Sequence, residues 1–124
     1  MVGQYFVTPL ALFHLRDLGD SGRERWGDTR NARYMADLRR AFQYIADHHK
    51  RLPDKTRLTG SHRLNVHGVN SHYVVFVVLA PDEIAITSVL HQRMDVAARL
   101  AELQARTDNE VGDLRAALLR RNLR

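Results

Sequence analysis

Residues 71–100 read SHYVVFVVLAPDEIAITSVLHQRMDVAARL, and this stretch decides the fold. Residues 72–79 are almost continuously apolar, which is typical of a strand that is buried on both faces of a sheet. APDE at residues 80–83 predicts a turn, and residues 84–90 predict a second strand that pairs with the first. Because the apolar run stops abruptly at LHQRMD, residues 90–95, the hairpin carries several polar side chains at one end.

The hairpin register predicts a pair of histidines. If Pro81 and Asp82 form a two-residue turn, His72 lies opposite His91 on one face of the sheet. Two neighbouring imidazoles, with Arg93 two residues further on, could bind phosphate or act in acid–base chemistry. The alternative is a pair of half-buried polar residues that hydrogen-bond to the backbone. Two ligands are too few for a typical zinc site, so we expect no metal and no cofactor.

The other side chains at this end of the hairpin have structural interpretations. Asp95 suits the N-cap position of a helix that begins at residue 96. Met94 is expected in the core. Arg93 could pair with Asp95 or Asp37, although its place at the strand exit favours contact with a target.

The N-terminal half predicts a strand followed by two helices. Residues 3–8 are rich in aromatic and β-branched side chains, as in a strand. Thr8 and Pro9 then suit the N-cap and first position of a helix. Gly27 ends this helix, and an apolar stripe of helical period predicts a second helix over residues 29–48.

The complete order predicts an α+β fold of the form β-α-α-β-β-β, in which an antiparallel sheet meander is packed by two N-terminal helices. Residues 62–67 supply the remaining strand. Two further helices are expected at residues 95–106 and 108–124, with Thr107 or Asp108 capping the second. We therefore predict one domain over residues 1–100 and a C-terminal helical extension, residues 101–124, packed on it.

Most other aromatic residues and histidines have packing interpretations. Trp26 is expected to be a core or interface anchor, whereas Tyr34, Phe42 and Tyr44 are interpreted as packing residues. His48 and His49 end a helix, where a protonated imidazole is favourable. His62 and His67 are expected on opposite faces of one strand, so they do not form a site.

Composition limits the possible partners and chemistry. The chain of 124 residues is 44% hydrophobic, carries a formal net charge of +5 and contains no cysteine. The positive charge favours an acidic partner, either a nucleic acid or an acidic protein. Disulfide and thiol chemistry are excluded. Since the sequence has neither a long apolar run nor a signal-peptide pattern, we expect a cytoplasmic protein without membrane contact.

Three segments together resemble the ParE toxins of the RelE/ParE superfamily, from type II toxin–antitoxin modules. The first is TPLALFHLRDL at residues 8–18, where His14 stands at a usually acidic position. RWGD at residues 25–28 is followed by ARYMADLRRAFQYIA at 32–46. The third segment is residues 62–100. In it the family positions fall on Arg63, His72, Tyr73, His91, Arg93, Met94 and Asp95.

The resemblance implies a choice between two activities. ParE-like members generally inhibit DNA gyrase, whereas RelE-like members cut messenger RNA in the ribosome. RNA cleavage requires a general base, a general acid and cations for the developing phosphate charge. Residues 72–79 contain no lysine or arginine, and Arg99 stands where RelE-like chains carry a tyrosine. The resemblance thus favours a non-enzymatic gyrase inhibitor. A RelE-type endonuclease and an inactive module that only binds its antitoxin are the alternatives.

The resemblance also implies partners and contact residues. A cognate ParD-like antitoxin is expected to wrap the toxin with an amphipathic helix, in a module for plasmid stabilization. Nucleic acid is then reached only indirectly, through the antitoxin complex. No catalytic residue is assigned. The expected gyrase contacts are His91, Arg93, His72, Arg63 and Arg99. The expected antitoxin contacts are Arg33, Arg40 and Trp26.

Overall fold

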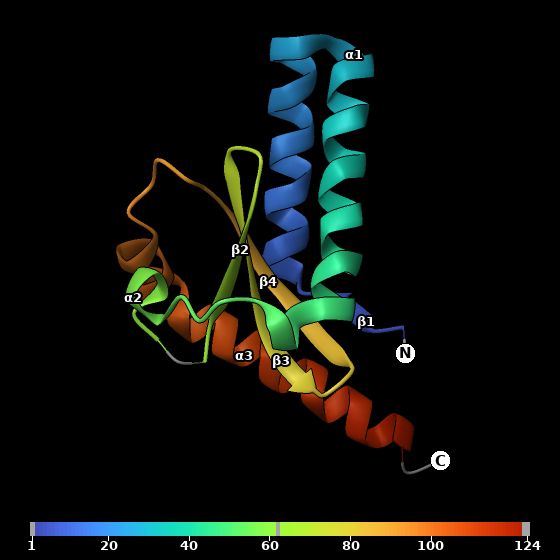
Figure 1. The fold of residues 1–124 in the computed structure, drawn as a ribbon, viewed down its shortest axis with the longest axis vertical. Helices are drawn as coiled ribbons and strands as arrows, with labels where there is room; N and C mark the ends of the chain where they lie inside the picture. Colours follow the sequence, from blue (N-terminus) through green and yellow to red (C-terminus); the bar gives the residue numbers. More distant parts are fainter. Residues whose placement is uncertain (1, 62, 123–124) are drawn as a thin grey trace.

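Four strands form one sheet in the order β1-β4-β3-β2 in the computed structural model, which describes residues 2–61 and 63–122 (Figure 1). The strands are β1 (Gln4–Val7), β2 (Asn65–Val69), β3 (His72–Ala80) and β4 (Glu83–His91). β2, β3 and β4 form an antiparallel meander, which confirms the predicted arrangement. β1 pairs with β4 in parallel, and the helices between them supply the crossover that a parallel pair requires.

The strand predicted at residues 62–67 is shifted toward its turn. β2 begins at Asn65 and continues to Val69, because the turn needs only two residues before β3. Asn70 adopts a left-handed conformation with φ of 53°, which asparagine tolerates better than most residues. His62 lies outside the described residues.

A helical hairpin, α1 (Pro9–His48), rises from the sheet and extends well beyond its edge (Figure 1). Gly27 interrupts the helix with φ of 79° and ψ of 171°, a conformation that glycine adopts at little cost. It separates a first arm, residues 9–26, from a second arm, residues 28–48. The prediction of two helices divided at Gly27 is therefore confirmed.

The two arms approach each other closely at Gly22 and Asn31. The Asn31 side-chain amide donates to the carbonyl of Gly19 at 2.9 Å. A Cβ atom at Gly22 would lie 2.1 Å from the Asn31 Oδ1 atom, so a larger residue would displace the Asn31 side chain. This contact holds the hairpin closed above the level of the sheet.

Thr8 joins the sheet to the first arm. Its backbone amide donates to Ile86 of β4 at 3.0 Å. The buried hydroxyl donates to the carbonyl of Thr87 at 3.3 Å and accepts from the amide of Ala11, also at 3.3 Å. Thr8 is thus the N-cap that the sequence predicts, and it also fixes where α1 leaves the sheet.

Both faces of the sheet are covered. The α1 face is packed by Ala11, Leu38, Phe42, Ile45, Val74, Phe76, Ile84 and Ile86. The other face packs against α2 (Thr56–Thr59) and α3 (Val96–Asn122), through Val66, Val75, Leu90, Val96 and Leu100. Because consecutive β3 side chains point to opposite faces, the buried residues 74–76 show that β3 is covered on both faces there, as its apolar run predicts. Toward the turn the prediction is wrong, since Val78 is 38% exposed.

α3 is a single helix, so the prediction of two helices divided near Thr107 is wrong. Thr107 lies within the helix and is only 6% exposed. The carboxylate of Asp108 pairs with Arg63 at 3.2 Å and does not start a new helix. Local cap signals predict a helix end near Thr107, but packing against the rest of the chain outweighs them, and the helix continues.

The second half of α3 reaches the start of α1. The Glu110 carboxylate accepts from the backbone amide of Leu10 at 2.8 Å, one of the amides that a helix N-terminus leaves unpaired. Val111 is 7% exposed, whereas Leu119 is 64% exposed. Although α1 and α3 are long, no helix among the described residues is apolar enough to cross a membrane.

We expect the far half of α3 to contribute to the stability of the free chain. Val111→Ala should lower the free energy of unfolding by about 1.5 kcal/mol, since it removes two buried methyl groups. Leu119→Ala is the matched control and should change it by less than about 0.5 kcal/mol. Urea unfolding measures both variants.

Truncation after Arg106 should lower the melting temperature without changing the oligomeric state. The mass in solution should fall only by the mass of the removed residues. A halved mass would show that α3 instead mediates a contact between two chains. Unchanged stability in Val111→Ala and in the truncated chain would contradict packing of α3 on its own chain.

Candidate functional site

The open end of the β3–β4 hairpin brings two imidazoles together. His72 pairs with His91 across the strands, and the ring centroids lie 5.0 Å apart with an interplanar angle of 73°. The predicted histidine pair is therefore confirmed. The register contains two irregularities, an extra residue at Thr87 in β4 and another at Leu79 in β3. One extra residue lies in each strand, so the two register shifts cancel. Counting residues back from the turn therefore still pairs His72 with His91.

Hydrogen bonds orient both rings. The Tyr34 hydroxyl bonds to the Nδ1 atom of His72, and the Ser71 hydroxyl lies 3.4 Å from the same atom. The backbone amide of Arg93 donates to the Nδ1 atom of His91 at 3.0 Å. A neutral His91 then carries its proton on Nε2, which can donate to an acceptor on a binding partner.

Tyr34 was missed as a site residue, because its helical spacing indicates only packing. Its hydroxyl is oriented toward His72 by the tertiary fold, and no local motif connects residues this far apart in sequence. The Tyr34 ring also lies 5.9 Å from Trp26 and 5.6 Å from His72, centroid to centroid. The guanidinium of Arg30 lies 5.4 Å from the Trp26 ring centroid. The rings of Trp26, Tyr34, His72 and His91 thus form a continuous series. It runs from the end of the first arm, here named the arm tip, to the histidine pair.

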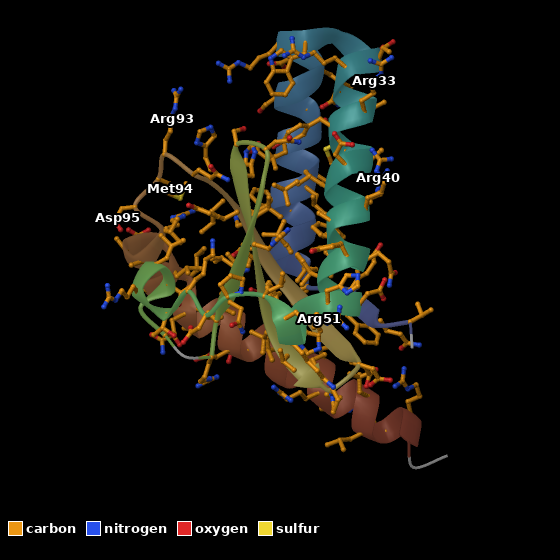
Figure 2. All side chains as sticks on the ribbon, viewed as in Figure 1. Arg33, Arg40, Arg51, Arg93, Met94 and Asp95 are labelled. Atoms are coloured by element: carbon orange, nitrogen blue, oxygen red, sulfur yellow. The ribbon has the colours of Figure 1, made fainter. Side chains whose placement is uncertain are left out.

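The expected antitoxin contacts are not all brought together. Figure 2 shows Arg33 and Arg40 projecting from the outer side of the second arm. Arg40 pairs there with Asp37, and Arg33 borders a shallow hollow with Asp28. Trp26 is instead part of the ring series that ends at His72 and His91.

Burial keeps the histidine pair from acting as a simple cationic site. Burial, and then the charge of the neighbouring His91, lowers the pKa of His72 from 6.5 to about 4. Burial also raises the pKa of Tyr34. At neutral pH a neutral imidazole therefore faces a neutral phenol, an arrangement suited to hydrogen bonding. Among residues 2–61 and 63–122, no group of three histidine, aspartate or glutamate side chains could hold a metal ion.

The strand exit presents Arg93 to solvent. Its side chain is exposed and projects away from the sheet (Figure 2), and it forms no ion pair within the described part of the chain. The Asp95 carboxylate accepts from the amide of Ala98 at 3.2 Å, so the predicted N-cap is confirmed. The expectation that Met94 is in the core is wrong. Met94 is 40% exposed, because the turn after β4 carries it away from both sheet faces.

Arg63 and Arg99 have other partners. Arg63 pairs with Asp108 beside a groove of about 680 Å³ between α3 and the sheet. Arg99 pairs with Glu102 of its own helix at 2.9 Å. Burial, followed by the charge of Arg99, lowers the pKa of His14, whose Nδ1 atom accepts from the amide of Val89 at 3.2 Å. Of the five expected target contacts, only His72, His91 and Arg93 lie together.

A second candidate surface lies between the two arms and the edge of the sheet. This interarm groove has a volume of about 690 Å³. Its apolar lining includes Tyr5, Val7, Leu12, Leu15, Met35 and Phe42, and its charged lining includes Arg16, Asp20, Arg23 and Arg39. The Asn31 Oδ1 atom is buried at the groove without a hydrogen-bond partner among the described residues. No local sequence pattern marks Asn31, because its place depends on how the arms pack.

The lowered pKa of His72 predicts a pH-dependent stability. The folded state favours the neutral imidazole of His72 over the protonated one. The contribution of His72 to the free energy of unfolding is therefore complete above about pH 6.5 and is lost as the pH falls toward about 4. His72→Gln removes the titrating group. Its stability difference from wild type should therefore shrink by about 1 to 3 kcal/mol between pH 7.5 and pH 4.5. Urea unfolding at both pH values measures this, and a constant difference would contradict it.

Comparison with known proteins matches this architecture to one family. The family model described as the ParE toxin of the type II toxin–antitoxin system parDE matches residues 5–96. A curated relative from Mycobacterium tuberculosis, "Toxin ParE1", is 31% identical over 102 residues, which cover 81% of this chain and 100% of the relative. "Toxin ParE" from Escherichia coli is 29% identical over 98 residues, covering 79% and 93%.

A solved structure shares the fold at low sequence identity. The chain is similar, with a TM-score of 0.63 and 12% identity, to a chain in the structure titled "Chromosomal ParDE TA system from P. aeruginosa". The alignment covers 73% of this chain and 96% of that one. Together with the family match over most of the sequence, these findings show that the chain belongs to the ParE toxins of type II toxin–antitoxin systems.

Proposed function

We propose that this ParE-family chain is a toxin that inhibits DNA gyrase in the cytoplasm by binding it, and that a cognate ParD-like antitoxin neutralises it. Family membership is the observation that carries the proposal. The strand exit offers a suitable contact surface, with a guanidinium at Arg93 free of ion pairs in the described structure and an imidazole donor at His91. Trp26 at the arm tip extends this surface through Tyr34 and His72.

Binding without catalysis agrees with the chemistry of the site. RNA cleavage would require groups that exchange protons near neutral pH and cations that stabilise a phosphorane. His72 is buried and has a pKa of about 4, which is far from the value that favours a general base at neutral pH. Arg63 and Arg99 are held by carboxylates away from the pair. The histidine pair therefore suits recognition better than phosphoryl transfer.

We further propose that the antitoxin occupies the interarm groove. An amphipathic helix could place its apolar face on Leu12, Leu15 and Met35 and its carboxylates near Arg16 and Arg39. The buried Asn31 Oδ1 atom could accept a hydrogen bond from a donor on that helix. The antitoxin chain would then continue around the second arm to the outer surface formed by Arg33 and Arg40.

The gyrase proposal predicts loss of supercoiling without cleavage of messenger RNA. Purified toxin is added to a gyrase supercoiling assay and, separately, to translating ribosomes. His91→Ala combined with Arg93→Ala should abolish inhibition and growth arrest, because it removes exposed contacts. The melting temperature should stay within a few degrees of wild type.

A control variant separates a specific effect from a general one. Asn109→Ala with Arg120→Ala changes an exposed polar residue and an exposed cation on α3, and it should remain fully inhibitory. RNA cleavage with intact supercoiling would favour the endonuclease alternative. A histidine–arginine double variant that remains toxic would show that the strand exit does not contact the target.

The antitoxin proposal predicts a salt-sensitive complex. Arg16→Glu with Arg39→Glu should weaken antitoxin binding by tenfold or more. The carboxylates of the antitoxin would then face the two introduced carboxylates at the groove and be repelled. Arg33→Glu with Arg40→Glu should weaken it by a smaller factor, because their outer surface is more exposed to solvent. Titration calorimetry between about 50 and 300 mM salt measures both effects. Equal affinity for wild type and both variants across this range would rule out electrostatic docking here.

A further inference from the structure

A strongly basic segment leaves the second arm and takes no part in the contacts proposed above. Residues 48–57, here named the basic crossover, read HHKRLPDKTR. They include the short helix η1 (His49–Arg51) and connect α1 to α2. The segment carries Lys50, Arg51, Lys55 and Arg57 but only one carboxylate, that of Asp54.

The basic crossover is anchored to the fold at several points. The His49 ring bonds through Nε2 to the carbonyl of Pro81, at the β3–β4 turn, with a distance of 2.8 Å. Leu52 packs on the core under α1, and Leu58, just past the segment, packs on the core under α3. The Asp54 carboxylate accepts from the amide of Thr56 at 2.9 Å. These contacts hold the backbone in place while the long cationic side chains extend from it.

The cations of the crossover have no carboxylate partners within the described structure. All the ion pairs among residues 2–61 and 63–122 lie elsewhere. Lys50, Arg51 and Arg57 are exposed, and Arg51 lies at the foot of the second arm (Figure 2). Four like charges along one anchored segment repel one another, and an anionic partner would relieve this repulsion.

One exposed ring, that of Tyr44, contacts the histidine at which the crossover begins. Tyr44 is 48% exposed, and its centroid lies 4.8 Å from that of His48 and 5.5 Å from that of His67 on β2. Burial, and then the charge of Lys55, lowers the pKa of His67. Cations interleaved with exposed rings are typical of surfaces that follow a nucleic-acid strand.

The shape of the surface favours a nucleic acid over an amphipathic protein segment. The interarm groove, the α3 groove and the hollow beside Arg33 are all lined by residues outside the crossover. An amphipathic helix needs an apolar groove, whereas a nucleic-acid backbone offers a negative charge at every phosphate. We propose that the basic crossover binds the phosphate backbone of nucleic acid directly, through Lys50, Arg51, Lys55 and Arg57. This contact goes beyond the proposed function, and it differs from the expectation, implied by the family resemblance, that nucleic acid is reached only through the antitoxin complex.

Fluorescence anisotropy of the full-length toxin with labelled nucleic acid tests the proposal without gyrase or antitoxin. The probes are a DNA duplex of about 20 base pairs, a single strand of the same length and a poly-glutamate peptide of similar charge. We expect a Kd of about 10⁻⁶ to 10⁻⁴ M for nucleic acid near physiological salt, weakening steeply as salt is added. Comparison of the duplex and the single strand identifies which form binds better.

Charge-matched variants locate the contact. Arg51→Gln with Lys55→Gln should weaken binding about tenfold and reduce the slope of log Kd against log salt by about 2. Arg25→Gln with Arg120→Gln removes two exposed cations elsewhere and should have a much smaller effect. If both variants lost affinity for nucleic acid equally, the effect would be one of net charge alone, and the proposal would be overturned. Poly-glutamate binding as tight as DNA, which would indicate an acidic protein partner, or a Kd weaker than about 1 mM for both nucleic acids would also overturn it. Melting temperatures verify that each variant is folded.

Discussion

The buried pairing of β3 with β4 is the constraint on which the rest of this structure depends. Both strands lie in the middle of the sheet, so their backbone amides and carbonyls must be satisfied by neighbouring strands. Both faces are also covered, by α1 on one side and by α2 and α3 on the other. A strand in this position cannot carry charge along its length. The charged and imidazole side chains of both strands therefore stand at strand ends, and the histidine pair with Arg93 occupies one of these ends.

The same burial determines the chemistry of the histidine pair. His72 is 6% exposed, and it receives a hydroxyl bond from the second arm of α1. Its imidazole is kept neutral, so the site gains hydrogen-bonding capacity and loses the positive charge that phosphate chemistry would use. His91, at the outer end of the pair, is oriented by the backbone amide of Arg93. The strand exit thus carries one buried and one more accessible imidazole, next to a guanidinium.

Three surfaces with different chemistry follow from how the helices meet the sheet. The arms of α1 extend past the sheet (Figure 1). The groove between them combines an apolar lining with arginines. The strand exit is small and polar. The basic crossover is held against the β3–β4 turn by His49 and carries four cations with one carboxylate. The three surfaces differ in chemistry, and each of the proposed partners, an amphipathic segment, a folded target and a polyanion, is matched to one of them.

The sequence by itself determined the features that depend on local periodicity and turn chemistry. Thr8 and Gly27 set the limits of the first arm, and the apolar run of β3 predicted a strand buried on both faces. The two-residue turn at Pro81 and Asp82 also predicted the pairing of His72 with His91. Tertiary packing decided the rest. It kept α3 as one helix past Thr107, because the buried contacts there outweigh a local cap signal. It also placed Tyr34 on His72 and left Met94 in solvent, since these positions depend on the relative placement of distant elements, which no local pattern encodes.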